Sequence, residues 1–170
     1  MSGRHLTGHL AAAATNLAFK DDLTGLFNRR LLSHLFEHWW EELASEHQQM
    51  ALLILDLDRF KAVNDTYGHL AGDVVLRRVA EILRHTFRGD DILVRFGGDE
   101  FVVLLPGAGR EEAGVLAERA RHALVTSSFT APSAGMVIEV PVSFSLGVAS
   151  YPDDGELGEA ILGRADERLY

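Results

Sequence analysis

Residues 92–105, ILVRFGGDEFVVLL, place the strongest constraint on the fold, because two apolar runs flank a pair of glycines and a pair of acids. Short runs rich in Val, Leu and Phe around glycines are typical of a β-hairpin, and glycine reaches positive φ at little cost. The pattern predicts two strands joined by a tight turn at Gly97 and Gly98. Asp99 and Glu100 would lie at the tip, uncovered by any core. Two adjacent acids on a turn are commonly no more than a solvated loop.

A second acidic cluster raises the functional interest of this pair. Residues 50–55, MALLIL, are an apolar run typical of a strand buried on both faces, and Asp56 and Asp58 follow it. If this strand lies beside the hairpin, Asp56, Asp99 and Glu100 meet at one end of the sheet. Carboxylates are hard ligands suited to Mg²⁺ or Mn²⁺, which activate hydroxyls and neutralise leaving pyrophosphate. The residues alone therefore predict metal-dependent nucleotidyl or phosphoryl transfer.

The rest of the chain alternates helical and strand patterns. Apolar spacing predicts helices over residues 1–19, 29–46, about 74–87, 110–126 and 156–170, and strands over 136–142 and 143–150 after a loop at 127–135. Residues 59–73 are predicted as a loop or short helix. Asp73 at its end could serve simply as the N-cap of the helix that follows. Trp39 and Trp40 are expected in the core. This order predicts an α/β (α+β) sandwich with helices on the faces of a mixed sheet of about five strands.

Length and composition exclude several classes of protein. A chain of 170 residues predicts one domain with a sizeable core, and its net charge of −9 argues against non-specific binding to nucleic acid. No apolar stretch is long enough to span a bilayer, so no membrane contact is expected from this segment. The absence of cysteine excludes disulfides and thiolate metal sites and fits a reducing cytoplasm. The sequence also lacks a P-loop and a nucleophile elbow.

Five ordered motifs identify a family resemblance: DDLTGLFNRR, DLDRFKAVNDTYGHLAGD, RFGGDEF, VSFSLGVA and ADERLY. From residue 21 to residue 170 the chain resembles the GGDEF-domain diguanylate cyclases, which join two GTP molecules into cyclic di-GMP and release pyrophosphate. The resemblance implies a fold like that of nucleotidyl cyclases and polymerase palm domains. It also implies a signal-transmitting, dimerising helical linker at 1–19, a catalytic domain at 20–170, and a homodimer in which two domains face each other. Such a domain is commonly the cytoplasmic output of a larger sensor.

The resemblance also implies a function for individual residues. Asp56 and Asp99 would be ligands of two Mg²⁺ or Mn²⁺ ions per active site, with the Leu57 carbonyl as a backbone ligand. Glu100 would be a further ligand or the group that helps deprotonate the 3′-hydroxyl. The guanine edge would contact Asn64 and Asp73, with His69 assisting. The remaining substrate contacts would come from Phe60, Lys61, Arg95, Gly97 and Gly98, of which the first three would meet the phosphates.

Arg88 and Asp91 stand where the family carries its product-inhibition site, and Arg119 matches a secondary arginine of that site. An arginine fork suits phosphate and the Hoogsteen edge of guanine, and a carboxylate accepts guanine N–H groups. Outside the family context, RGDD would be an ordinary charged turn. The expected activity is a diguanylate cyclase with feedback inhibition. The alternative is a catalytically silent domain that acts as a cyclic di-GMP receptor through Arg88 and Asp91.

Overall fold

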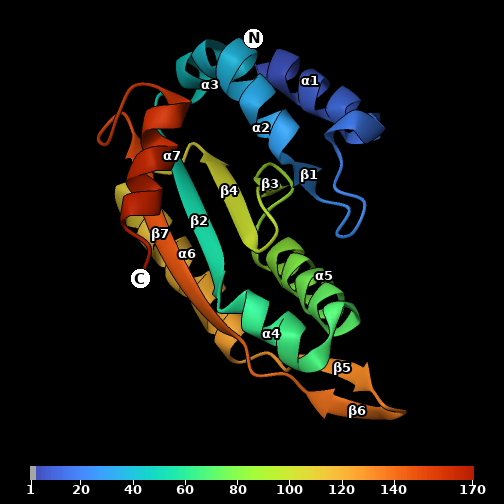
Figure 1. The fold of residues 1–170 in the computed structure, drawn as a ribbon. Coiled ribbons are helices and arrows are strands. Elements are labelled where there is room, and N and C mark those ends of the chain that lie inside the picture. Colours follow the sequence, from blue (N-terminus) through green and yellow to red (C-terminus); the bar gives the residue numbers. More distant parts are fainter. Residues whose placement is uncertain (1–2) are drawn as a thin grey trace.

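A five-stranded mixed sheet forms the centre of the structure, a computed structural model that describes residues 3–170, with side chains from residue 7 onward (Figure 1). The strand order is β1-β3-β4-β2-β7, in which only β1 and β3 pair in parallel. The predicted neighbourhood of the hairpin and the buried strand is confirmed, because β2 pairs antiparallel with β4. The strands are β1 (Phe27–Asn28), β2 (Met50–Asp58), β3 (Ile92–Arg95), β4 (Glu100–Pro106) and β7 (Ser143–Tyr151).

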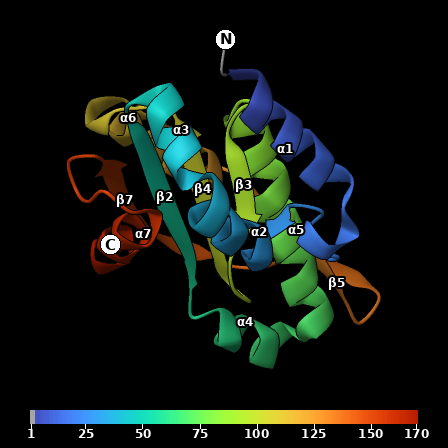
Figure 2. The ribbon, with the colours of Figure 1, turned by 90° about the horizontal axis from the view of Figure 1, so that it is seen from above.

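Helices cover both faces of this sheet because alternate residues of β2 point to opposite sides. Leu53 and Leu55 pack in one core cluster with α4 (Phe60–Tyr67), α5 (His69–Thr86) and α6 (Arg110–Val125). Leu52 and Ile54 pack in the other with α2 (Arg29–His34), α3 (Trp40–His47) and α7 (Gly158–Glu167). Figure 2 shows α7 on the side of β7 and α1 (Gly3–Thr15) on the side of β3. The predicted sandwich is confirmed.

The predicted helix over residues 29–46 contains a π-helical segment, Leu35–Trp39, between α2 and α3. Trp40 is buried and its indole N–H donates to the Glu156 carbonyl at 2.8 Å. Trp39 is only half-buried and stacks on His9 of α1 with ring centroids 5.0 Å apart, so its prediction as a core residue holds only in part. The first two residues of the predicted N-terminal helix lie outside the described residues. No helix in the described part is both long and apolar enough to cross a membrane.

Several predicted boundaries of strands and helices differ from the structure. The loop predicted over 127–135 contains a strand, β5 (Thr130–Ser133). The strand predicted over 136–142 is present as the shorter β6 (Met136–Glu139), but it pairs with β5 in a separate two-stranded sheet and not in the central one. The fifth strand of the central sheet is the two-residue β1, too short to give an alternating pattern. Asp73 is not an N-cap, because α5 already begins at His69, and its N-cap is Gly68 at φ 91°.

Candidate functional site

Three carboxylates meet where β2 ends and β4 begins. The register of these strands places Asp56 opposite Glu100, and the Leu57 N–H donates to the Asp99 carbonyl at 3.1 Å. One carboxylate oxygen from each of Asp56, Asp99 and Glu100 lies within 4.8 Å of the others. The structure therefore brings together the residues that the sequence placed at one end of the sheet.

The electrostatics of this cluster favour a cation. Burial and the charges of Asp99 and Glu100 raise the pKa of Asp56 to about 6. Burial, then the charge of Asp99, also raises the pKa of Glu100. Oδ1 of Asp56 is buried and has no hydrogen-bond partner in the described part of the chain. A buried acceptor without a donor and three repelling carboxylates fit a hard divalent ion such as Mg²⁺ or Mn²⁺.

The loop that carries Asp99 differs from the predicted tight turn. Four residues, 96–99, separate the end of β3 at Arg95 from the start of β4 at Glu100. The N–H groups of Phe96 and Gly97 both donate to the Glu100 carbonyl, at 2.8 and 3.2 Å. Neither Gly97 nor Gly98 has positive φ, so the predicted reason for the glycine pair is wrong. A four-residue loop does not need the left-handed conformations that two-residue hairpin turns require.

Arg95 closes this loop from one side. Its Nη1 lies 3.1 Å from Oδ1 of Asp21, and its Nη2 donates to the Gly98 carbonyl at 2.9 Å. Asp21 also accepts hydrogen bonds from the N–H and hydroxyl of Thr24, at 2.9 and 2.6 Å. Two guanidinium nitrogens of Arg95 therefore already contact protein groups, namely Asp21 and the Gly98 carbonyl. Sequence reasoning did not single out Asp21, although it begins the DDLTG motif.

The predicted guanine contacts come together between α4 and α5. Asn64 approaches α5 at Gly72. An added Cβ at Gly72 would lie 1.9 Å from Asn64 Oδ1, so this close approach requires a residue without a side chain. Asp73 follows directly and is half-buried, whereas His69 is exposed at the start of α5. At the start of α4, Phe60 is buried and Lys61 exposed, after Arg59 in the left-handed conformation at φ 53°. Asn64 therefore packs against Gly72, the residue that directly precedes Asp73.

The predicted inhibitory residues also meet, at the other end of β3. The Asp91 carboxylate accepts the Arg88 N–H at 2.8 Å, and the Asp91 N–H donates to the Arg88 carbonyl at 3.1 Å. Burial raises the pKa of Asp91. It outweighs the hydrogen bond from Arg88 and the positive charges of Arg88 and Arg119, which act to lower that pKa. Arg119 reaches across from α6 and donates to the Thr86 carbonyl. Two exposed arginines and one half-buried carboxylate thus share one surface.

Two further acids near the cluster have different surroundings. Asp58 accepts hydrogen bonds from the hydroxyls of Ser143 and Ser145, at 3.0 and 2.6 Å, and so ties β2 to β7. Asp166 of α7 adds negative charge near Asp56 and Glu100, and its charge also acts to raise both pKa values. No spacing in the sequence connects Asp166 to the hairpin, because Asp166 lies 60 residues beyond the end of β4 at Pro106 and only packing brings it there.

Comparisons with known proteins agree with this geometry. Residues 18–170 match the family described as diguanylate cyclase, GGDEF domain. The chain is 42% identical over 156 residues to the diguanylate cyclase DgcP of Pseudomonas aeruginosa, covering 90% of this chain and 22% of DgcP. It is 38% identical over 154 residues to the response regulator PleD of Caulobacter vibrioides, covering 91% of this chain and 34% of PleD. It thus spans about a fifth to a third of these two relatives.

Solved structures give the same result. The diguanylate cyclase SiaD of Pseudomonas aeruginosa, in complex with its activator SiaC, matches with a TM-score of 0.79 and 32% identity, covering 97% of this chain and 62% of SiaD. The GGDEF domain of DgcB from Caulobacter crescentus, in complex with c-di-GMP, matches with a TM-score of 0.78 and 27% identity, covering 89% of this chain and 85% of that domain.

Proposed function

Because the chain belongs to the GGDEF-domain family of diguanylate cyclases, we propose that it condenses two GTP molecules into cyclic di-GMP and two pyrophosphates. The single observation that carries the proposal is the convergence of Asp56, Asp99 and Glu100 within 4.8 Å. A catalytically silent domain has no evident need for three carboxylates that repel one another. The raised pKa values of Asp56 and Glu100 are the cost of holding them together without a cation.

Asp56, Asp99 and the Leu57 carbonyl would hold Mg²⁺ or Mn²⁺, two ions per active site. Bound there, the ions supply charge neutralisation for the triphosphate and lower the pKa of the attacking hydroxyl. Glu100 is either a further ligand or the acceptor of the 3′-hydroxyl proton. The Asp21–Arg95 pair holds the loop that positions Asp99.

The base would be recognised between α4 and α5. A carboxylate at Asp73 accepts from guanine N1–H and the 2-amino group, a donor pair that adenine lacks. Asn64 lies alongside, against Gly72, and His69 stands at the exposed start of the same helix. Phe60 and Lys61 begin the preceding helix, where backbone N–H groups and the ammonium charge would meet the triphosphate.

Catalysis would need two copies of the domain. Each domain offers one acidic cluster and one base site, so each GTP 3′-hydroxyl must attack an α-phosphate held by the partner domain. Residues 1–19 would set this dimer and transmit a signal from elsewhere in a larger protein. Helix α1 packs on the domain through Ala13 while most of its described outer residues remain exposed. Because both substrate and product are intracellular nucleotides, the domain would act in the cytoplasm.

Product would inhibit the enzyme at Arg88, Asp91 and Arg119. The two arginines suit phosphate and the Hoogsteen edge of guanine, and Asp91 suits guanine N–H groups. The DgcB structures, which are complexes with c-di-GMP, support a cyclic di-GMP site on a domain of this fold. The same residues support the second candidate function, a receptor that binds cyclic di-GMP without making it.

Calorimetry separates the two candidates. A cyclase binds a non-hydrolysable GTP analogue in the presence of Mg²⁺, and Asp73→Asn weakens that binding because one acceptor for guanine is lost. A receptor binds cyclic di-GMP but shows no heat with the GTP analogue. Absence of analogue binding at millimolar concentration would therefore exclude the cyclase and leave the receptor.

A further inference from the structure

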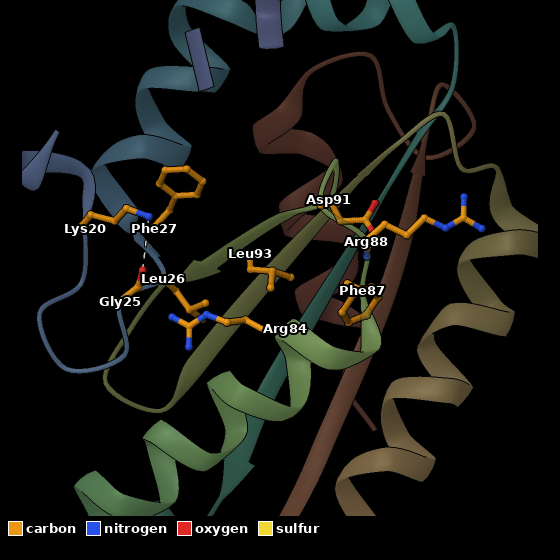
Figure 3. Close-up of a pocket in the computed structure, with 10 residues that line it drawn as sticks. Lys20, Gly25, Leu26, Phe27, Arg84, Phe87, Arg88, Asp91 and Leu93 are labelled. Atoms are coloured by element: carbon orange, nitrogen blue, oxygen red, sulfur yellow. Dashed lines mark hydrogen bonds between the residues drawn. The ribbon is translucent and has the colours of Figure 1, made fainter. Parts of the chain in front are cut away.

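A cleft of about 230 Å³ lies between the turn at residues 20–27 and the C-terminal end of α5 (Figure 3). Its apolar lining residues include Phe27 and Leu93, and its charged lining residues are Lys20, Arg84, Arg88 and Asp91. Three cations therefore border the cleft against one carboxylate. This excess of positive charge stands out in a chain whose net charge is −9.

Lys20 and Arg84 are both anchored on the same turn by backbone carbonyls. Lys20 Nζ lies 3.4 Å from the Gly25 carbonyl oxygen and 4.3 Å from the centroid of the Phe27 ring. Arg84 Nη2 donates to the Thr24 carbonyl. Gly25 has φ +71°, and a Cβ there would lie 3.0 Å from Arg84 Nη2. A glycine at this position therefore leaves room for the guanidinium next to the turn.

No ion pair within the described part of the chain neutralises the charges of these two cations. Among residues 7–170, neither Lys20 nor Arg84 forms an ion pair with a carboxylate. Burial, then the charge of Arg84, lowers the pKa of Lys20, as expected for two like charges held in one cleft. An ammonium has three N–H donors and a guanidinium five, so both keep donors for a ligand.

Arg88 and Asp91 border the cleft but are directed elsewhere. Figure 3 shows Arg84 pointing toward the turn at residues 20–27 and Arg88 pointing away from it. The Asp91 carboxylate accepts the Arg88 N–H, so it is held on that side. Lys20 and Arg84 therefore form a cationic pair separate from the residues assigned to product inhibition.

We propose that this cleft is a phosphate-binding site, with Lys20 and Arg84 as its two cationic ligands. Pockets that enclose a drug-sized ligand measure about 300–1,000 Å³, so this smaller cleft suits a phosphate or pyrophosphate group rather than a whole nucleotide. The group is either a free anion or the phosphate of a larger ligand that lies outside the cleft. The site does not depend on the cyclase assignment, because it shares no residue with the acidic cluster or the base site.

Titration calorimetry of the full chain with sodium pyrophosphate, in metal-free buffer at fixed ionic strength, tests the site. We expect binding that weakens about tenfold or more in the double variant K20Q/R84Q, because two charge-assisted contacts are lost. The matched control is R77Q/R78Q, which removes two positive charges from α5, the helix that carries Arg84, and leaves the cleft intact. Its affinity should equal that of the wild type. An equal loss in both double variants would mean general electrostatic attraction and would overturn the proposal.

A second titration with cyclic di-GMP identifies the source of the phosphate. If pyrophosphate does not bind but cyclic di-GMP affinity depends on Lys20 and Arg84, the cleft takes the phosphate of the larger ligand. If neither affinity depends on these two residues, the proposal is wrong. Amide NMR shifts of the wild-type chain give a readout independent of the variants. Pyrophosphate or cyclic di-GMP should shift Gly25 and Leu26, and shifts confined to other regions would contradict the site.

Discussion

Arg95 and Asp21 form an ion pair, with Nη1 3.1 Å from Oδ1, that joins the turn before β1 to the loop carrying Asp99. Both side chains are largely enclosed, with 16% and 19% of their surface exposed. Burial acts to raise the pKa of Asp21, but hydrogen bonds from Thr24 and the charge of Arg95 outweigh it and lower that pKa. The pair connects two motifs 74 residues apart.

Asp21→Asn should destabilise the domain and slow catalysis together. The variant leaves a largely enclosed guanidinium without its counter-charge, which costs about 1–3 kcal/mol of unfolding free energy. Because Arg95 also holds the Gly98 carbonyl, the loop around Asp99 loses support. Urea unfolding and GTP turnover measure the two effects.

Asp22→Asn is the matched control, since Asp22 is the exposed neighbour in the same motif. It should change the unfolding free energy by less than about 0.5 kcal/mol. Equal effects of the two substitutions would show that the ion pair does not support the loop.

Gly72→Ala should damage the predicted base site. An added Cβ would lie 1.9 Å from Asn64 Oδ1 and 3.1 Å from Phe60 Cζ, so Asn64 must move. Overpacking of this kind costs about 1–3 kcal/mol, and binding of a GTP analogue should weaken. Urea unfolding and calorimetry measure both.

Gly114→Ala serves as the control, because a Cβ there meets nothing within 4 Å on an exposed face of α6. It should stabilise the domain by about 0.5–1 kcal/mol through helix propensity. If Gly72→Ala also stabilises the domain and leaves nucleotide affinity unchanged, the close approach of Asn64 has no functional importance.

The sequence predicted the cluster of three carboxylates because acidic residues stand next to the ends of the predicted strands. Asp56 follows an apolar run and Asp99 follows a glycine pair, and antiparallel pairing of β2 with β4 then brings them together. The Asp21–Arg95 pair was missed, because no local pattern connects residues 74 positions apart. The sequence did not predict β1, because a strand of two residues is too short to show an alternating hydrophobic pattern. The glycine pair was predicted to form a tight turn with positive φ, and this is wrong because the loop has four residues rather than two.

Asp154 should make the domain sensitive to acid. Hydrogen bonding from Arg168 outweighs burial and lowers the pKa of Asp154 from 3.8 to about 2. A carboxyl with a lowered folded-state pKa stabilises the fold above pH 3.8 and loses that contribution as the pH falls toward 2. The contribution is at most about 2 kcal/mol, reduced by screening because Arg168 is partly exposed.

Asp154→Asn should therefore lower the unfolding free energy at pH 7 and converge with the wild type near pH 2. Asp153→Asn is the control, because that side chain is 57% exposed and lies 3.9 Å from Arg110. Urea unfolding between pH 2 and pH 7 gives the comparison. A difference between wild type and Asp154→Asn that does not shrink in acid would refute the assignment.

Arg88→Ala should raise GTP turnover once cyclic di-GMP has accumulated. Loss of a charge-assisted contact to phosphate or guanine weakens inhibition about tenfold or more, while the initial rate stays unchanged. Arg121→Ala is the control, because Arg121 lies on α6 near Arg119 and pairs with Glu118. Progress curves with added product make the measurement. Unchanged product sensitivity in Arg88→Ala would rule out the inhibitory site.

The most direct test of the central claim is cyclic di-GMP formation from GTP and Mg²⁺, measured by chromatography at high protein concentration so that two domains can meet. The wild type should form the dinucleotide and release two pyrophosphates for each one. Asp99→Asn should lower the rate about a hundredfold or more, because a proposed metal ligand is lost. No product from the wild type, or equal rates for wild type and Asp99→Asn, would contradict the assignment of the acidic cluster.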